Sequence, residues 1–398
     1  MAVTATATAT RTSSTKSEPV EPSTTLPDKT MRMSESSSPG VAPFKSVLIV
    51  RLSAMGDIIH TLPAASLLRQ AFPHATLGWL IEERWSELLC APRHPRSGER
   101  SAQRPLVDRV HTVDIARWRR ALLSFKTWQQ LSASLGALRD VQYDAVVDFQ
   151  GAVRSVLLGR RSGAPVVYGD AKPRESAARM FYTRKVLTTG THVVEQAVML
   201  ARAVVPDADI SALTAAQVEF PVDPEAEAKI AALVAESKFV ILNPGAGWGA
   251  KMWPAERYAS VARELGKDGL RSLINHGPGE AKLAMAVEAG SEGAAQKISC
   301  SVSELISLTR RARLLIGGDT GPMHLAAALK IPVVAIFGPT NPARNGPFGT
   351  QSIVLRSAGS TTDHTRHREP EQGLLQITVS DVVAAARKLL SGRIAESE

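Results

Sequence analysis

Residues Gly317 to His324 read Gly-Gly-Asp-Thr-Gly-Pro-Met-His, and they place small residues, a carboxylate and an imidazole directly after an apolar run. The apolar run, Leu314 to Ile316, predicts a buried strand, and Pro322 suits the first turn of a helix. A turn of small residues between a strand and a helix leaves backbone N–H groups unpaired at the positive end of the helix dipole. Phosphate groups bind at such ends, so the sequence predicts a phosphate site here.

A second turn of the same character, Gly338-Pro339-Thr340, follows the next apolar run, Pro332 to Phe337. Two such turns at the C-terminal ends of consecutive parallel strands outline one crevice, the usual ligand position in an open α/β sheet. We therefore predict a nucleotide-diphosphate site and place Gly338 and Thr340 in it.

Two further glycine-rich loops follow predicted strands, Asn243 to Pro254 and His276 to Glu280. Lys251 could neutralise a phosphate or stabilise a leaving diphosphate, and its alternative is a solvated loop lysine. Glu280 could accept hydrogen bonds from ribose or sugar hydroxyls, or it could cap the next helix. No loop matches GxxxxGK[ST], and no GxGxxG follows the first strand. A Walker-type ATPase and a dinucleotide-binding protein are therefore disfavoured.

A carboxylate, Asp57, ends the loop Ser53-Ala54-Met55-Gly56-Asp57, between the first predicted strand and its helix. An aspartate at a helix N-terminus often serves only as a cap. Here Gly56 lets the backbone approach a ligand closely, and His60 adds a second polar group to an otherwise apolar helix start. Both features favour a functional role for Asp57.

Short apolar runs alternate with helical periods, which predicts parallel α/β sheets. We expect a disordered segment at 1–44, one Rossmann-like domain at 45–205, a linker at 206–235 and a second Rossmann-like domain at 236–398. A Pro/Arg/Ser-rich surface insertion is expected at 91–104. Predicted strands are 46–50, 76–81, 106–113, 145–147, 239–242, 271–275, 312–316 and 332–337. Predicted helices are 58–71, 118–138, 192–204, 254–267, 279–290, 321–330 and 379–390.

The charge of the 398-residue chain is uneven: residues 45–204 carry 23 basic and 13 acidic side chains, whereas residues 205–398 carry 20 and 21. A basic half beside a neutral half suggests an anionic partner, although it could be a merely solvated basic surface. The sequence has no long apolar run and no secretory signal, which predicts a cytoplasmic protein. Cys90 and Cys300 are far apart and predict neither a disulfide framework nor a zinc site.

Several of these motifs together resemble the ADP-heptose:lipopolysaccharide heptosyltransferases, glycosyltransferase family 9, and most closely the members that add the first heptose to the Kdo–lipid A core. The resemblance runs from about Ser46 to Leu390. It is carried by Val47-Leu48-Ile49-Val50-Arg51, Ser53 to Ala64, Lys251-Met252-Trp253-Pro254, Asp319 to Leu325 and Phe337-Gly338-Pro339-Thr340.

The resemblance implies a GT-B fold, an α/β architecture of two Rossmann-like domains with the active site between them. It also implies an inverting transfer of heptose from ADP-heptose without a bound metal or another cofactor. Asp57 then corresponds to the general base that deprotonates the acceptor hydroxyl. Lys251, Thr320 and Gly321 would bind the ADP diphosphate, Glu280 would hold the ribose, and Asp319 with His324 would shape the donor pocket.

The implied acceptor is the Kdo residue of Kdo–lipid A, a phosphorylated and carboxylated lipid. An anionic acceptor of this kind would explain why the first half of the chain is basic. Segments 115–120 and 172–176 resemble the family's basic acceptor-binding segments. We expect acceptor contacts from Ser53, Gly56, Arg117, Arg119, Arg120 and Arg174. The helix around Trp118 could instead pack against the core. Such a cationic domain could also rest on the anionic inner-membrane surface, as a peripheral protein.

Three alternatives remain at this stage. A heptosyltransferase acting later on the core would differ in its choice of acceptor. A sugar-nucleotide epimerase of the same fold would convert a nucleotide sugar with no acceptor present. A nucleic-acid-binding protein is suggested by the sequence pI of about 9.7, but the aromatic platforms and recognition helices that sequence readout requires are missing, so we expect no nucleic-acid partner.

Overall fold

The computed structural model describes residues 44–121, 124–205, 218–235, 237–363, 365 and 367–395, without the side chains of Ala116, Arg119, Lys126 and 393–395. It contains two six-stranded sheets, in the orders β3-β2-β1-β4-β5-β6 and β12-β11-β10-β7-β8-β9. All strand pairs in both sheets are parallel. The predicted class, two Rossmann-like α/β domains, is confirmed.

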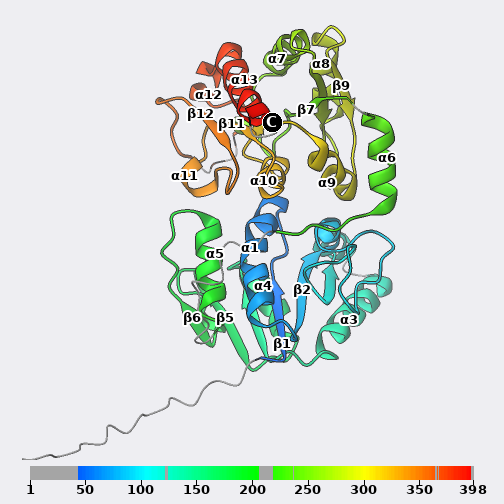
Figure 1. Cartoon of the computed structure of the whole chain (residues 1–398). Coiled ribbons are helices and arrows are strands. Elements are labelled where there is room, and N and C mark those ends of the chain that lie inside the picture. The colour runs from blue at the N-terminus through cyan, green and yellow to red at the C-terminus, as the bar shows by residue number, and fades with distance from the viewer. Residues whose placement is uncertain are drawn as a thin grey trace, which may run out of the picture. The chain divides into compact units, whose positions relative to one another are not determined.

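The first domain occupies the blue-to-green part of the chain in Figure 1. Its strands are β1 Ser46–Val50, β2 Thr76–Glu82, β3 Arg109–Val113, β4 Ala145–Asp148, β5 Val166–Asp170 and β6 Arg184–Val186. Its helices are α1 Met55–Ala71, η1 Glu83–Leu88, α2 Ile115–Arg120, α3 Phe125–Arg139, α4 Val153–Arg160, η2 Ser176–Phe181 and α5 Val193–Arg202.

The second domain follows in the green-to-red part of the chain (Figure 1). Its strands are β7 Phe239–Asn243, β8 Arg271–Asn275, β9 Ala295–Ile298, β10 Leu315–Gly318, β11 Val333–Phe337 and β12 Ser352–Arg356. The helices of this part are α6 Pro224–Val234, η3 Gly249–Lys251, α7 Ala255–Lys267, α8 Ala281–Gly290, α9 Val302–Arg311, α10 Gly321–Ala328, α11 Pro342–Asn345, α12 Gln372–Gln376 and α13 Val379–Ala395.

Each sheet has a hydrophobic core on both of its faces. Successive residues of a strand point to opposite sides, so each strand contributes to both cores. Val47 and Ile49 of β1 join the core under α1 and α5, whereas Leu48 and Val50 join the core under α3 and α4. The second sheet repeats this pattern between α7 and α13 on one face and α6, α9 and α10 on the other. Strands buried on both faces explain the continuous apolar runs of the sequence.

The two domains share part of one core. Leu305, Ile306 and Leu325 from the second domain belong to the same buried cluster as α1. At the point of closest approach, a Cβ on Gly321 would lie 2.7 Å from the sulfur of Met55. A Cβ on Gly56 would lie 2.6 Å from the His324 ring. Glycine at these two positions therefore allows the N-terminal ends of α1 and α10 to meet.

Several predicted boundaries were wrong. The helix expected at 58–71 begins at Met55, and that expected at 118–138 is two helices, α2 and α3. The strand expected from Leu106 begins at Arg109. The elements β5, β6, β9, β12 and α4 were not predicted, because their short or mixed sequences give weak periodicity. The helix α9 was also not predicted, although it is amphipathic and Ser301 with Glu304 forms a capping box at its start. The second half of the predicted 206–235 linker forms α6, while the segment expected to be disordered, 1–44, lies outside the described residues except for Phe44.

The predicted insertion at 91–104 is organised by a buried arginine. Arg104 is buried, and its guanidinium donates to the carbonyls of Val107, Gly98 and Glu99 at 3.0, 2.6 and 2.7 Å. Its guanidinium is therefore hydrogen-bonded to backbone oxygens of this segment and of the residues just after it. Among the described helices, none is both long enough and apolar enough to span a membrane.

Candidate active site

The sheet order places four loops at the switch points of the two domains. The order reverses between β1 and β4 in the first sheet and between β7 and β10 in the second. Ligands of open α/β sheets bind outside the C-terminal ends of the strands at such points. The segments that follow these four strands carry Asp57, Gln150, Lys251 and Thr320.

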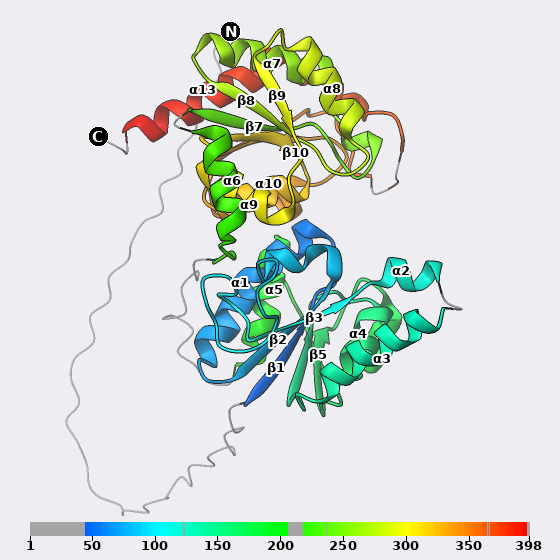
Figure 2. The same cartoon turned by 90° about the vertical axis from the view of Figure 1, so that its right-hand side faces the viewer.

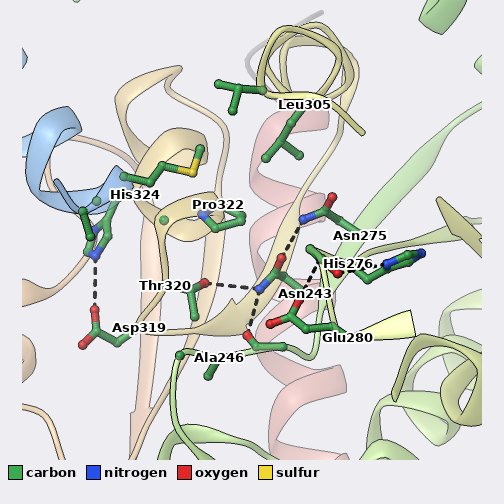
Figure 3. A pocket seen from close by; sticks show the side chains of 18 of the residues that line it. Asn243, Ala246, Asn275, His276, Glu280, Leu305, Asp319, Thr320, Pro322 and His324 are labelled. Carbon is green, nitrogen blue, oxygen red and sulfur yellow. Dashed lines mark hydrogen bonds and ion pairs between the residues drawn. The ribbon is translucent and has the colours of Figure 1, made fainter. Parts of the chain in front are cut away.

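Two cavities of about 700 Å³ each lie along these loops. The first cavity contains six of the predicted donor residues, shown in part in Figure 3: Lys251, Glu280, Asp319, Thr320, Gly321 and His324. The second cavity is lined by Arg51, Gln150, Lys172, Arg174 and Arg344, among others. Residues that line both are Asp57, His60, Trp248, Lys251 and Asn345.

Asp57 is in the first turn of α1 with 42% of its side chain exposed. Its Oδ2 accepts the N–H of Ala54 at 3.2 Å, and its Oδ1 pairs with Nη2 of Arg51 at 3.0 Å. The carboxylate therefore has a cap-type contact, as the simpler interpretation expected. It is also ion-paired and lines both cavities, which a simple helix cap need not do.

The loop that carries Asp57 is fixed from β4. Oε1 of Gln150 accepts the N–H groups of Leu52 and Ser53 at 2.8 and 3.3 Å. Arg51 donates through Nη1 to the Phe149 carbonyl, and its own carbonyl accepts from the indole of Trp79 at 3.1 Å. Contacts on both sides of the loop hold its backbone in one place.

Lys251 is not a solvated loop lysine, because only 14% of its side chain is exposed. Its Nζ lies 2.6 Å from Oδ2 of Asp319 and 5.3 Å from the centre of the Trp248 ring. Burial favours the neutral acid, but the hydrogen bond and charge of His324, together with Lys251, hold the pKa of Asp319 well below its ordinary value. Asp319 is thus an anion that holds the side chains of Lys251 and His324 in place beside the first cavity.

A chain of histidines continues from Asp319 across the two domains. Nε2 of His324 lies 3.1 Å from Oδ1 of Asp319, and Nδ1 of His324 lies 3.0 Å from Nε2 of His60. Burial, followed by the neighbouring His324 and His192, lowers the pKa of His60 well below its usual value. His60 is therefore neutral near pH 7, and its buried Nδ1 has no hydrogen-bond partner among the described residues.

A second contact between the domains involves His192. Its Nδ1 accepts the N–H of Val194 at 3.2 Å, so the proton of the neutral ring is on Nε2. That Nε2 lies 3.1 Å from the carbonyl oxygen of Gly346, in the second domain. Burial lowers the pKa of His192, which favours this neutral tautomer.

Asparagines support the floor of the first cavity (Figure 3). Nδ2 of Asn243 donates to Oγ1 of Thr320 at 3.2 Å, and Oδ1 of Asn243 accepts from Asn275 at 2.8 Å. Glu280 precedes α8 without capping it through its side chain; its Oε2 accepts the N–H of Gly277 at 2.8 Å. A Cβ on Gly245 would lie 2.3 Å from this carboxylate, so a larger residue at this position would displace the Glu280 carboxylate.

The turn before α10 differs in part from the prediction. The N–H groups of Met323 and His324 donate to the Thr320 carbonyl at 3.1 and 3.3 Å, and Pro322 has no N–H. The end of α10 therefore offers fewer outward donors than the sequence suggested, although the dipole and Lys251 still favour an anion there.

The other predicted site residues are placed as follows. Gly56 and Arg174 line the first and second cavities, respectively. Ser53, Gly338, Thr340, Arg117 and Arg120 are not among the residues that line either cavity. The side chain of Arg119 lies outside the part of the chain that the structure describes.

Sequence reasoning did not select Arg51, His60, His192, Asn243 or Asn275 as site residues. His60 could have been found, because its spacing of three from Asp57 places both on one face of a helix. Asn243 and Asn275 are polar residues at the ends of buried strands, which is also a usable signal. Nothing local to His192 identifies its contact with the second domain.

Comparison with known proteins supports one family. The family model described as glycosyltransferase family 9 (heptosyltransferase) matches residues 133–375. Lipopolysaccharide heptosyltransferase 1 of Pseudomonas aeruginosa is 31% identical over 318 residues, which cover 78% of this chain and 83% of that protein. Lipopolysaccharide heptosyltransferase 1 of Escherichia coli K12 is 29% identical over 324 residues, covering 78% and 93%.

Among solved structures, E. coli heptosyltransferase WaaC with ADP superposes with a TM-score of 0.67 at 26% identity, covering 86% of this chain and 99% of that chain. E. coli ADP-heptose lps heptosyltransferase II superposes with a TM-score of 0.68 at 19% identity, covering 88% and 99%, which is a likeness of fold alone. The two-domain architecture is the GT-B fold of these enzymes. The chain is a glycosyltransferase and belongs to glycosyltransferase family 9, the heptosyltransferases.

Proposed function

We propose that this enzyme transfers L-glycero-D-manno-heptose from ADP-heptose to the Kdo residue of Kdo–lipid A, with inversion at the anomeric carbon and Asp57 as general base. The observation that carries the proposal is that Asp57 lines both cavities. A base in that position can reach a hydroxyl in the second cavity while a sugar donor occupies the first. The names of the relatives, lipopolysaccharide heptosyltransferase 1, favour the first heptose over a later one.

On the donor side, the first cavity supplies groups suited to ADP-heptose. Lys251 and the N-terminal end of α10 would bind the diphosphate, and Glu280 would accept hydrogen bonds from ribose hydroxyls. Asp319 need not contact the phosphates, because its role would be to hold Lys251 and His324 in place. A relative of this chain has been solved with ADP, which supports the same donor class.

On the acceptor side, basic side chains outnumber acidic ones in the lining of the second cavity, which also includes Asp57, Asp148 and Asp170. Arg51, Lys172, Arg174 and Arg344 line it, with Gln150 beside them. These side chains suit the carboxylate of a Kdo sugar, since arginine binds carboxylates in bidentate geometry. Arg51 has a second role here, because its ion pair fixes one oxygen of Asp57.

The reaction is a single displacement. The acceptor hydroxyl gives its proton to Asp57 as its oxygen forms a bond to the anomeric carbon. The bond between that carbon and the diphosphate oxygen breaks at the same time, and its electron pair leaves with ADP. Lys251 and the α10 dipole would stabilise the charge that develops on the diphosphate. We also propose that the enzyme works at the cytoplasmic face of the inner membrane, where such a lipid acceptor would be reached.

The test uses the purified full chain, with transfer from ADP-heptose to Kdo–lipid A as the readout. Asp57→Asn should lower kcat by about 10²–10⁴-fold, the range of general-base catalysis, and leave ADP affinity nearly unchanged. Lys251→Ala should instead weaken ADP binding. Asp140→Asn, at an exposed carboxylate after α3, is the matched control and should retain full activity. Retained turnover in Asp57→Asn would remove Asp57 from the base role.

The acceptor is tested separately by offering Kdo–lipid A and an already heptosylated core to the same preparation. Preference for Kdo–lipid A is expected, and preference for the heptosylated core would replace the proposed substrate with a later one. Thermal unfolding with ADP, UDP and GDP checks the donor class, because a ligand that binds the folded state raises Tm. ADP should give the largest shift.

A further inference from the structure

The segment from Ile115 to Arg139, which forms α2 and α3, carries several basic side chains, most of them near its start. It contains Arg117, Arg119, Arg120, Lys126 and Arg139, with no Asp or Glu. The side chains of Arg117 and Arg120 are exposed, and neither lines the first or the second cavity or forms an ion pair with a described residue. The proposed reaction therefore leaves these two cations without a role.

Large aromatic side chains accompany these cations. Phe125 and Trp128, three residues apart at the start of α3, lie on the same side of the helix. Their exposed fractions are 83% and 58%, so Phe125 is the most exposed large apolar side chain among the described residues. Exposed aromatics beside basic residues are the composition of surfaces that insert into the headgroup layer of anionic membranes.

This pair of helices follows the sheet at its C-terminal end, which is also the end where the segment with Asp57 lies. The strands β1, β2 and β3 are parallel, and α2 follows the C-terminal end of β3 just as Asp57 follows that of β1. Figure 2 shows α2 beyond the end of β3. Trp118 is half-buried against the core beneath α3 and anchors α2, whereas Arg117 and Arg120 are exposed.

We propose that Arg117, Arg120, Phe125 and Trp128 form a docking face for an anionic lipid bilayer, here called the α2–α3 face. This inference rests on the proposed function, because only a lipid-linked acceptor gives a reason for docking near the C-terminal end of the sheet, where Asp57 lies. The arginines attract anionic headgroups over a distance set by salt, and the two aromatic rings insert among them. Docking through this face would bring the C-terminal end of the first sheet, after which Asp57 lies, toward the membrane surface.

The test measures co-sedimentation of the full chain with vesicles, in the absence of donor and acceptor. We expect binding to mixed phosphatidylcholine–phosphatidylglycerol vesicles, weaker binding at high salt, and little binding to phosphatidylcholine alone. Arg117→Gln with Arg120→Gln should lower the partition coefficient by about 30-fold, since each basic residue near an anionic surface contributes roughly fivefold. Phe125→Ser with Trp128→Ser should lower it by about tenfold.

The matched control is Lys282→Gln with Met285→Ser. This pair offers a basic and an apolar side chain, both exposed and three residues apart, on α8 of the second domain. It should bind vesicles like the unmodified chain. Any of three outcomes would overturn the proposal. They are an equal loss of vesicle binding in this control, unchanged vesicle binding in both α2–α3 variants, and vesicle binding that does not depend on phosphatidylglycerol.

A second measurement separates this inference from the proposed function. Phe125→Ser with Trp128→Ser should retain turnover on an acceptor freed of its acyl chains, yet lose activity on Kdo–lipid A presented in vesicles. If the unmodified chain shows no turnover on either acceptor, the proposed function fails whatever the vesicle binding shows. If both acceptors are used equally by the variant, the α2–α3 face has no part in membrane docking.

Discussion

His60 and His324 join the two domains through one hydrogen bond, with Nε2 of His60 3.0 Å from Nδ1 of His324. The opposite nitrogen of His324 faces the carboxylate of Asp319, which also holds Lys251. A residue of α1 thus reaches the proposed phosphate-binding lysine through two intermediates. Since Asp57 lies one helical turn before His60, base and phosphate-binding groups are held in one connected arrangement.

Substitution of His60 should therefore impair the reaction without touching the proposed chemistry directly. His60→Ala leaves Nδ1 of His324 buried without a partner, which costs about 1–3 kcal/mol. We expect roughly a tenfold fall in kcat, with a smaller change in the KM for the acceptor. His60→Gln, which can still donate to His324, should recover part of the loss. Equal kcat in His60→Ala and the unmodified enzyme would show that the contact is only structural.

Arg51 is expected to position Asp57. Its side chain is 16% exposed and fixes Oδ1 of the carboxylate at 3.0 Å. Arg51→Gln should lower kcat by about 10- to 100-fold while ADP affinity stays constant, because the base loses its orientation. Arg51→Lys retains the charge but cannot reproduce the planar guanidinium contacts, so only partial recovery is expected. Steady-state kinetics and ADP titration distinguish this outcome from a general loss of folding.

The close approach of α1 and α10 gives a two-site prediction. In Gly321→Ala the new methyl group would meet the Met55 side chain, with contacts of 2.7 and 2.8 Å that one of the two domains must relieve. We expect lower Tm and lower kcat/KM for ADP-heptose. Met55→Ala removes the obstructing atoms, so the double variant should be better than the sum of the two single changes. Strict additivity would mean that the clash is relieved elsewhere.

Stability should fall on the acid side because of buried histidines. Burial, and then the charge of Arg109, lowers the pKa of His111 to about 4, and its Nε2 lies 2.8 Å from the Tyr143 hydroxyl. The unfolded chain binds this proton near pH 6.5 and the folded chain only near pH 4. The free energy of unfolding therefore decreases as pH falls through that window, by up to about 3 kcal/mol.

Denaturant unfolding at several pH values checks this, with His111→Gln as the comparison. The variant should lose stability less steeply between pH 6.5 and 4 than the unmodified chain. Asp148 acts in the opposite sense, because burial raises its pKa to about 6 and its contribution is lost as pH rises from about 4 to 6. Both proteins contain Asp148, so the difference between their slopes isolates His111. Identical slopes would contradict the prediction.

Much of the fold could be predicted from local pattern. The buried strands around Ile49, Ile241 and Val334 are continuous apolar runs, and Gly-rich loops follow them at the positions where ligands bind in parallel sheets. The short edge strands β6, β9 and β12 were missed. They include exposed or half-buried residues and have no distinctive periodicity.

The sequence by itself determined two parallel α/β domains, the loops that hold Asp57, Lys251 and Thr320, and a basic first half, because these depend on residue type and on spacing along the chain. Only the tertiary structure decided which groups meet. The bond between His60 and His324 joins residues 264 positions apart, and Arg117 and Arg174 differ in whether they line a cavity. Such relationships arise from the packing of one domain on the other, and no local periodicity encodes that packing.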